Sequence, residues 1–131
     1  MIMTESAKSA GTILVIDDED IVVDISEAML KHLGYDILSA KTGKDAIDLA
    51  KTYNGNIDLA LLDLGMPDMG GDKIFSHLKS TRPDLKVIIC SGYRVEGLGQ
   101  DVLDAGAQAF LQKPFSLEGI SEKLKQVLSC H

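Results

Sequence analysis

Several polar residues come directly after short apolar runs of the sequence, at points where the chain would leave a buried strand. They are Asp17, Asp18, Asp63, Ser91 and Lys113, and Gly92 follows Ser91 with a backbone amide to offer. Three carboxylates held close together repel one another unless a cation neutralises them. With oxygen ligands and neither His nor Cys among them, the acids favour a hard ion, Mg²⁺, with Mn²⁺ as the alternative.

The same residues suit chemistry on a phosphoryl group. An aspartate can attack phosphorus and form an acyl phosphate. A metal ion and the Lys113 ammonium would neutralise the phosphoryl charge, and the Ser91 hydroxyl and Gly92 amide would donate to its oxygens. Singly, each has a simpler explanation, such as helix capping for the acids or turn formation for Asp63. Together they predict phosphoryl transfer onto an aspartate.

The apolar runs that precede these residues indicate strands of a parallel sheet. Four runs stand out, at residues 13–16, 59–62, 87–90 and, more weakly, 109–111, and a fifth segment at 35–40 carries Ile37 and Leu38. They are continuous rather than alternating, which suits strands covered on both faces. In an open sheet of this kind, ligands bind beyond the carboxyl ends of the strands, where the polar residues would meet.

Apolar residues at helical spacing lie between and after the runs and predict five helices, hence a doubly wound α/β domain. The expected buried stripes are Ile21, Ile25, Ala28, Met29 and Leu33; Ala46, Leu49, Ala50 and Tyr53; Ile74, Phe75 and Leu78; and Leu117, Ile120, Leu124, Val127 and Leu128. Gly34 should end the first helix. The helix near residues 95–105 should be short or mobile, because its two glycines each cost about 1 kcal/mol relative to Ala.

Composition limits the classes of function. The 131 residues allow one domain, expected over residues 11–131 after a disordered tail at 1–10. A net charge of −7 repels phosphate backbones, so we expect no direct nucleic-acid partner. Short apolar runs exclude a transmembrane helix, and two cysteines without a metal or disulfide pattern suggest the cytoplasm.

Four strings, each at an expected strand end, resemble the receiver domain of two-component response regulators, which is chemotaxis-regulator-like. They are Val15-Ile16-Asp17-Asp18, the run from Leu61 to Gly71, Ile89-Cys90-Ser91-Gly92 and Phe110-Leu111-Gln112-Lys113-Pro114-Phe115. The match covers residues 12–128 and is most similar to receivers fused to hybrid sensor histidine kinases. It implies a flavodoxin-like (βα)5 fold, with five parallel strands in the order 2-1-3-4-5 and helices on both faces.

The resemblance also implies a role for each site residue. Asp63 would be the phosphoacceptor, and Asp18, Asp63 and the Gly65 carbonyl would ligate Mg²⁺, with Asp17 acting through water. The phosphate-binding residues would be Ser91, Gly92 and Lys113. Ser91 and the aromatic Phe110 would form the switch, altering the face made by the fourth helix, fifth strand and fifth helix. A cis peptide bond is expected at Lys113–Pro114.

Two further positions would set the lifetime of the phosphoryl group. Gly65 has no side chain to orient a water in line with the Asp63–phosphorus bond, and the ring of Tyr93 would cover the same approach. Both favour slow self-dephosphorylation. The alternative for Tyr93, equally open, is a simple surface position.

The resemblance implies a signalling switch with self-catalysed phosphorylation and dephosphorylation, rather than an enzyme. Its partner would be a sensor histidine kinase or a histidine phosphotransfer domain, and it would be a monomer or weak dimer. The chain would be a stand-alone receiver or part of a longer protein such as a hybrid kinase. Two alternative functions are disfavoured. An aspartyl phosphatase would carry a second Asp where Gly65 stands, and a flavodoxin-like FMN binder would have its FMN phosphate repelled by the acids after the first run.

Overall fold

Five parallel strands form the centre of the computed structural model, which describes residues 9–92 and 98–129. They are β1 (Thr12–Ile16), β2 (Asp36–Ala40), β3 (Leu59–Asp63), β4 (Lys86–Ser91) and β5 (Ala109–Gln112). Their order is β2-β1-β3-β4-β5, which confirms the expected topology. The expected tail at residues 1–10 stays a prediction, since residues 1–8 lie outside the described part.

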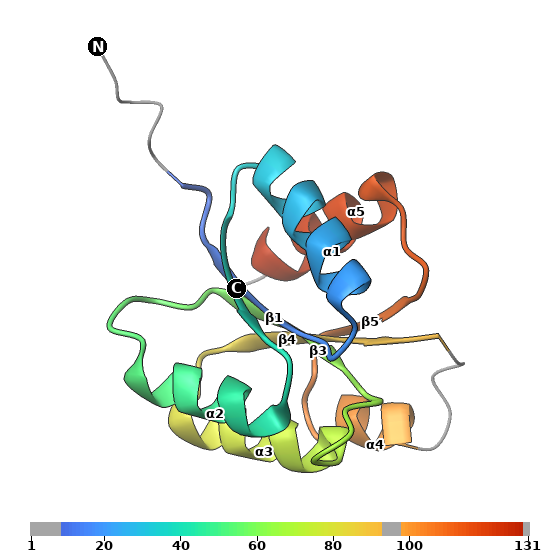
Figure 1. Cartoon of the computed structure of the whole chain (residues 1–131). Helices are drawn as coiled ribbons and strands as arrows, with labels where there is room; N and C mark the ends of the chain where they lie inside the picture. Colours follow the sequence, from blue (N-terminus) through green and yellow to red (C-terminus); the bar gives the residue numbers. More distant parts are fainter. Residues whose placement is uncertain (1–8, 93–97, 130–131) are drawn as a thin grey trace.

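Helices cover both faces of this sheet. They are α1 (Asp20–His32), α2 (Gly43–Thr52), α3 (Gly71–Thr81), α4 (Leu98–Asp104) and α5 (Leu117–Ser129). Helices α1 and α5 lie on one face, and α2, α3 and α4 lie on the other (Figure 1). Right-handed crossovers between parallel strands place the helices in this way.

Alternate residues of each strand supply two hydrophobic cores. In β1, Leu14 and Ile16 join the core beneath α2, α3 and α4, whereas Ile13 and Val15 join the core beneath α1 and α5. All four side chains are at most 2% exposed. The continuous apolar runs therefore reflect burial on both faces, as a parallel sheet requires.

The expected buried stripe of α1 is correct for Met29 and Leu33, which are half-buried against the core beneath α1 and α5, and wrong for its other members. Ile21 and Ile25 are 68% and 49% exposed, and the helix instead buries Val23, Ser26 and Leu30. Both sets recur at helical spacing, and the one in contact with the sheet is decided by how α1 leaves β1. Leu117 of α5 is also exposed, at 37%.

The ends of two helices follow the sequence expectations. Gly34, which follows the C-cap residue Leu33 of α1, has a φ of +95°, a conformation that favours glycine at a helix end. Helix α4 has only seven residues, so it is short as expected, while residues 95–97 of the predicted segment lie outside the described part.

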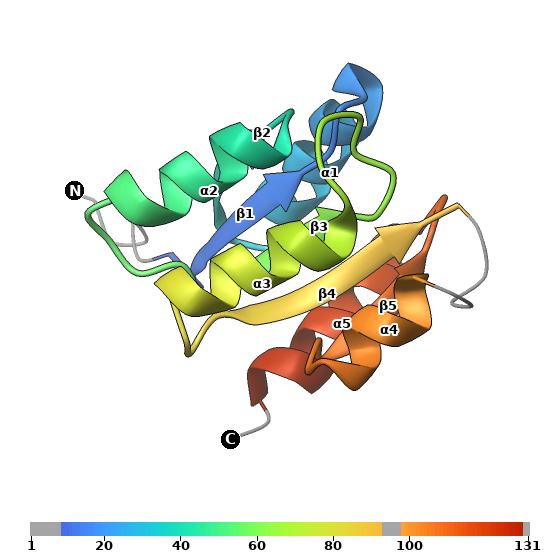
Figure 2. The same ribbon diagram turned by 90° about the horizontal axis from the view of Figure 1, so that it is seen from below.

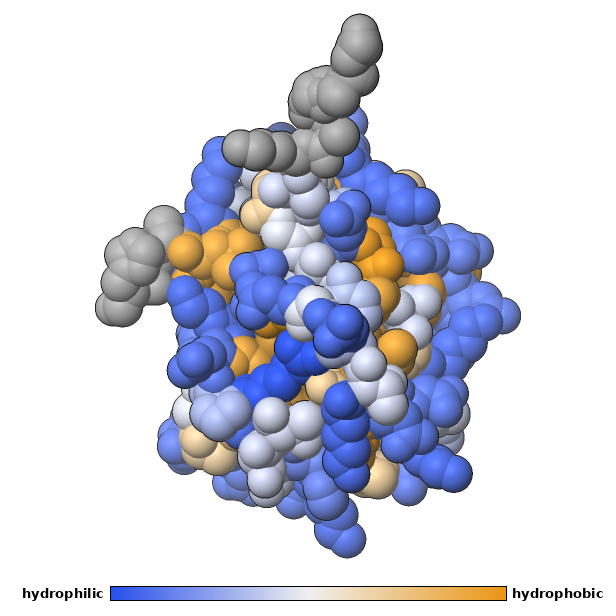
Figure 3. All heavy atoms as spheres, turned by 90° about the vertical axis from the view of Figure 1, so that its left-hand side faces the viewer, coloured by the Kyte–Doolittle hydropathy of each residue, from blue (hydrophilic) through white to orange (hydrophobic). Residues whose placement is uncertain are grey.

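The face of the molecule at which the strands begin is largely hydrophilic, with smaller hydrophobic areas between polar side chains (Figure 3). In the described part of the chain, no helix is both long and apolar enough to span a bilayer. The opposite face, where the strands end, carries the residues that the sequence pointed to.

Candidate functional site

The carboxyl ends of four strands bring the predicted residues to one edge of the sheet. Asp17 follows β1, Asp63 and Ser91 are the last residues of β3 and β4, and Lys113 follows β5. Because these strands are parallel neighbours, their ends lie side by side. The sequence prediction that these groups meet is therefore correct.

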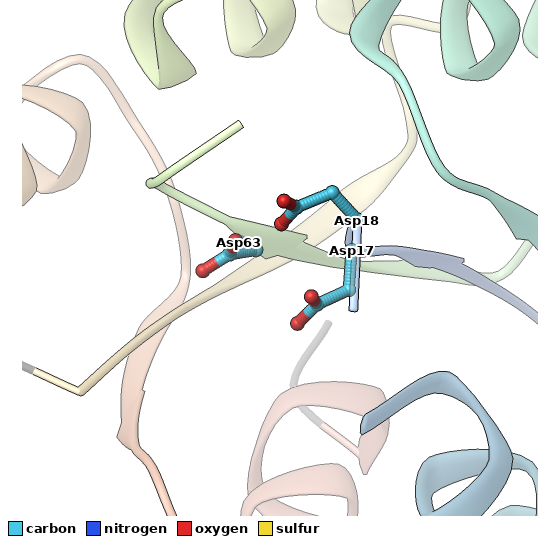
Figure 4. A group of neighbouring side chains, drawn as sticks. All are labelled: Asp17, Asp18 and Asp63. Atoms are coloured by element: carbon cyan, nitrogen blue, oxygen red, sulfur yellow. The ribbon is translucent and has the colours of Figure 1, made fainter. Parts of the chain in front are cut away.

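Asp17, Asp18 and Asp63 form an acidic cluster in which ligand oxygens of the three side chains lie within 4.8 Å of one another. Figure 4 shows them grouped at the ends of β1 and β3. Asp17 and Asp63 are buried, with 3% and 8% exposure, whereas Asp18 is exposed. An all-oxygen cluster open to solvent on one side fits a hard cation that keeps part of its water shell.

Lys113 holds two of these carboxylates. Its ammonium Nζ donates to Asp17 Oδ2 at 2.5 Å and to Asp63 Oδ1 at 3.1 Å. Burial lowers the pKa of Lys113, but its hydrogen bond to Asp17 and the charge of Asp63 outweigh that effect and raise the pKa overall. The lysine therefore stays charged and offsets part of the carboxylate repulsion.

Asp63 keeps an elevated pKa despite this partner. Burial is the largest cause and Asp17 adds to it, while the charge of Lys113 and a hydrogen bond from the Gly65 amide act in the opposite direction. The backbone supports the cluster as well, since the Glu19 amide donates to Asp17 Oδ1 at 3.0 Å. The site thus holds more negative charge than its own cations neutralise, which favours an added cation.

Ser91 and Phe110 lie on neighbouring strands. Ser91 pairs in register with Gln112, and Phe110 pairs with Ile89, two residues before Ser91. Phe110 is half-buried and packs against the core beneath α2, α3 and α4. Gly92 is exposed beside the site, and Tyr93 lies outside the described residues.

The chain after β5 continues along the site. The Lys113 amide donates to the Ser91 carbonyl at 2.7 Å, which joins the ends of β4 and β5. The Lys113–Pro114 peptide bond is cis, as expected.

A groove of about 980 Å³ opens in front of the acidic cluster, and we call it the site groove. Asp63, Ser91 and Lys113 lie at its polar part, and Val22 and Ile25 of α1 line an apolar part. The sequence did not indicate this groove. Val22 and Ser26 of α1 both line the groove and lie one helical turn apart in the sequence. Their spacing identifies the groove only when the face of α1 that meets the sheet is known.

Comparisons with known proteins agree with this geometry. The model of the response regulator receiver domain matches residues 13–125. The chain is 31% identical over 119 residues to the sensor kinase CckA of Brucella abortus, covering 91% of this chain and 13% of that protein. It thus spans a small part of that kinase, and about half of the regulator TcrX from Mycobacterium tuberculosis.

Solved structures are similar over nearly the whole chain. A CheY-like receiver domain protein from Methanospirillum hungatei JF-1 is 31% identical, with a TM-score of 0.84, covering 92% of this chain and 94% of that one. The CheX–CheY–BeF3–Mg²⁺ complex from Borrelia burgdorferi is 26% identical, with a TM-score of 0.87 and coverages of 95% and 94%. The chain therefore belongs to the response regulator receiver domain family, whose members are signalling switches of two-component phosphorelays rather than classical enzymes.

Proposed function

We propose that Asp63 accepts a phosphoryl group from the phosphohistidine of a sensor kinase or a histidine phosphotransfer domain. The observation that carries the proposal is the position of its carboxylate, at a strand end, beside two further carboxylates and the Lys113 ammonium. A carboxylate oxygen of Asp63 forms the new bond to phosphorus while the phosphorus–nitrogen bond to the donor imidazole breaks. Lys113, Ser91 and Gly92 contact the phosphoryl oxygens and stabilise their charge.

The acidic cluster suits Mg²⁺, with Mn²⁺ as an alternative. Asp18, Asp63 and the Gly65 carbonyl would hold the ion directly, and Asp17 would act through water. Its donor set is entirely oxygen, and the open side at Asp18 leaves room for bound water. When bound, the ion supplies positive charge that neutralises the carboxylates and the phosphoryl oxygens. The Borrelia burgdorferi complex, which contains BeF3 and Mg²⁺, supports the same assignment.

Ser91 and Phe110 would pass the signal on. As the Ser91 hydroxyl is drawn to the phosphoryl group, the half-buried ring of Phe110 would turn inward from its neighbouring strand. The surface that changes would be the one formed by α4, β5 and α5.

The exposed side of α1 would receive the phosphodonor. Ile21 and Ile25 expose apolar surface on α1, and Ile25 lines the site groove that leads to Asp63. An apolar patch beside the acceptor suits a protein donor, whereas a small-molecule donor needs only the polar part of the groove. We further propose that the domain works in the cytoplasm as a monomer or weak dimer.

The experiment that tests phosphorylation uses acetyl phosphate and Mg²⁺. We expect the intact mass to rise by one phosphoryl group, with no labelling of Asp63→Asn and none in excess chelator. Asp18→Ala should reduce Mg²⁺ binding severely. Labelling of Asp63→Asn equal to wild type would rule out the acceptor, and labelling in chelator would rule out the metal.

The donor surface is tested with a purified histidine kinase that labels the wild-type chain. Ile25→Ala together with Ile21→Ala should slow transfer from the kinase about tenfold while acetyl phosphate labelling stays unchanged. Leu117→Ala, another exposed apolar residue, is the matched control and should transfer normally. Equal slowing of the control would remove the role of α1.

Gly65 would also lengthen the life of the phosphoryl group, together with Tyr93. A Cβ at Gly65 would lie 3.7 Å from Asp63 Oδ2, an ordinary contact, so a larger side chain fits there. Gly65→Asn should accelerate decay several-fold by orienting water, and Tyr93→Ala should do so by opening the approach. Decay measured after donor removal decides the question, since two unchanged rates would show that neither position sets the lifetime.

A further inference from the structure

The loop between β3 and α3, residues 64–70, carries the Gly65 carbonyl and needs to be held still if that carbonyl is to bind a metal. Its first residue is fixed by the Leu64 amide, which donates to the Cys90 carbonyl at 3.1 Å. The Met66 side chain is buried in the core, with 7% exposure. The remainder of the loop is exposed or half-buried, so its fixation must come from other contacts.

Asp68 supplies such a contact by joining the loop to the start of α2. Its Oδ1 accepts from the Gly43 amide at 2.9 Å, and its Oδ2 accepts from the Lys44 amide at 3.1 Å. Figure 2 shows the loop beside the end of α2 at which that helix begins. These amides lack partners within the helix and carry the positive end of its dipole. The hydrogen bond from Gly43 is the largest cause of a lowered pKa at Asp68.

Packing joins the same two segments independently. A Cβ placed on Gly43 would lie 3.1 Å from Met69 Cβ and 2.9 Å from Ile74 Cδ1. The start of α2 therefore lies directly against the loop and α3, with no space for a side chain between them. A displacement of the loop would have to displace the first turn of α2 as well.

We infer that Asp68 is a positioning residue that couples the metal-binding loop to the first turn of α2. This inference rests on the proposed role of the Gly65 carbonyl as a Mg²⁺ ligand. Asp68 lies three residues after Gly65 in the same loop. When Mg²⁺ orders Gly65, it therefore also holds Asp68 in place, and the Gly43 and Lys44 amides that donate to Asp68 are protected from hydrogen exchange. The coupling is reciprocal, and loss of the Asp68 contact therefore weakens Mg²⁺ binding.

Thr42 offers a matched control at the same helix end. Its Oγ1 accepts from the Asp45 amide at 3.0 Å, so it caps α2 from within its own segment. Thr42→Ala should destabilise the first turn of α2 without removing the connection to the loop. Asp72→Ala, which removes a nearby exposed acid of α3, controls for the change in net charge.

The experiment measures Mg²⁺ affinity by calorimetry, and amide hydrogen exchange in residues 42–46 with and without Mg²⁺. In the wild type, Mg²⁺ should slow exchange at Gly43 and Lys44. Asp68→Ala should abolish that slowing and weaken Mg²⁺ binding about tenfold. Asp68→Asn keeps one acceptor oxygen and should recover part of both effects, whereas Thr42→Ala and Asp72→Ala should keep the wild-type affinity.

Several outcomes would overturn the inference. The first is a wild-type protein that binds Mg²⁺ without slower exchange at Gly43 and Lys44. The second is an Asp68→Ala protein that still shows this slowing, and the third is a Thr42→Ala protein whose Mg²⁺ affinity falls as far as that of Asp68→Ala. The proposed function fails separately, through labelling of Asp63→Asn by acetyl phosphate. Either conclusion can thus fall while the other stands.

Discussion

Helices α2 and α4 lie on the same face of the sheet but are held in different ways. Helix α2 is fixed at its first turn by Asp68 and at its last turn by Arg82, a residue at the end of α3. The Arg82 guanidinium donates to three backbone carbonyls. They are those of Ala50 at 2.8 Å, Tyr53 at 2.7 Å and Gly55 at 2.9 Å. An acid at the start of a helix and a base at its end both match the helix dipole.

Helix α4 is short and has weaker support among the described residues. It has seven residues, and Val102 is its buried apolar side chain, with 1% exposure. Its side-chain hydrogen bond, from Gln100 to Asp104, is exposed and lies within the helix. Helix α2 is thus tied to neighbouring segments at both ends, whereas α4 has the short length and sparse side-chain contacts that are typical of elements that move.

The largest effect we expect is a response to a phosphoryl mimic that is confined to α4 and the segments next to it. Beryllofluoride added to the Mg²⁺-loaded protein should change amide exchange several-fold in residues 91–115 and leave α2 and α3 nearly unchanged. Asp63→Asn should show no response. An equal change of amide exchange in α2 and α3 would contradict the contrast between these helices and α4.

A mutation pair should show the same contrast in stability. Arg82→Ala should lower the free energy of unfolding by about 2 kcal/mol, because three carbonyls lose a charged donor. Gln100→Ala, which removes the exposed bond of α4, should change it by less than about 0.5 kcal/mol. Urea unfolding followed by far-UV circular dichroism measures both. Equal losses would mean that the two helices are supported alike.

The smallest effect we expect is on the free energy of unfolding, and it concerns Asp63 at the end of the central strand β3. Burial raises its pKa, so the folded protein binds this proton more tightly than the unfolded chain does. Ionisation therefore costs stability as the pH rises through the raised pKa. Without metal, Asp63→Asn should be more stable than wild type at pH 7, by less than the Arg82 effect.

The pH series supplies the check on this assignment. The stability gap between Asp63→Asn and wild type should narrow as the pH falls below the raised pKa, and it should close once Asp63 is protonated in the unfolded chain as well. Thermal unfolding measured from pH 7 downward follows the gap. Asp84→Asn, at an exposed aspartate, is the matched control for the loss of one carboxylate. A gap that is constant with pH would exclude ionisation as its cause.

The fold was predictable because three of its strands, β1, β3 and β4, are buried on both faces. Continuous runs such as residues 13–16 appear in the sequence as strands without any knowledge of their neighbours. The parallel arrangement then places Asp17, Asp63 and Lys113 at one edge, which is why the candidate site was predictable too. Both inferences need only local pattern and one rule about parallel sheets.

Other features depend on contacts that local pattern does not contain. Ile21 and Ile25 recur at helical spacing just as Val23 and Leu30 do, so periodicity alone cannot choose the buried side of α1. Asp68 contacts an amide 25 residues earlier in the chain. Its local sequence indicates a turn and nothing about α2. Such contacts follow from the assembled fold and were beyond sequence analysis.

The position of Cys90 has a consequence for chemoselectivity. Cys90 is the register partner of Asp63, so a sulfur and an oxygen nucleophile stand side by side at the end of the sheet. Burial raises the pKa of the thiol to about 12. The thiol is therefore protonated at pH 7, and the thiolate is the form of cysteine that attacks electrophiles. Asp63 lines the site groove, whereas Cys90 is buried in the core, so an electrophile that enters the groove meets the carboxylate while the thiol stays both covered and protonated.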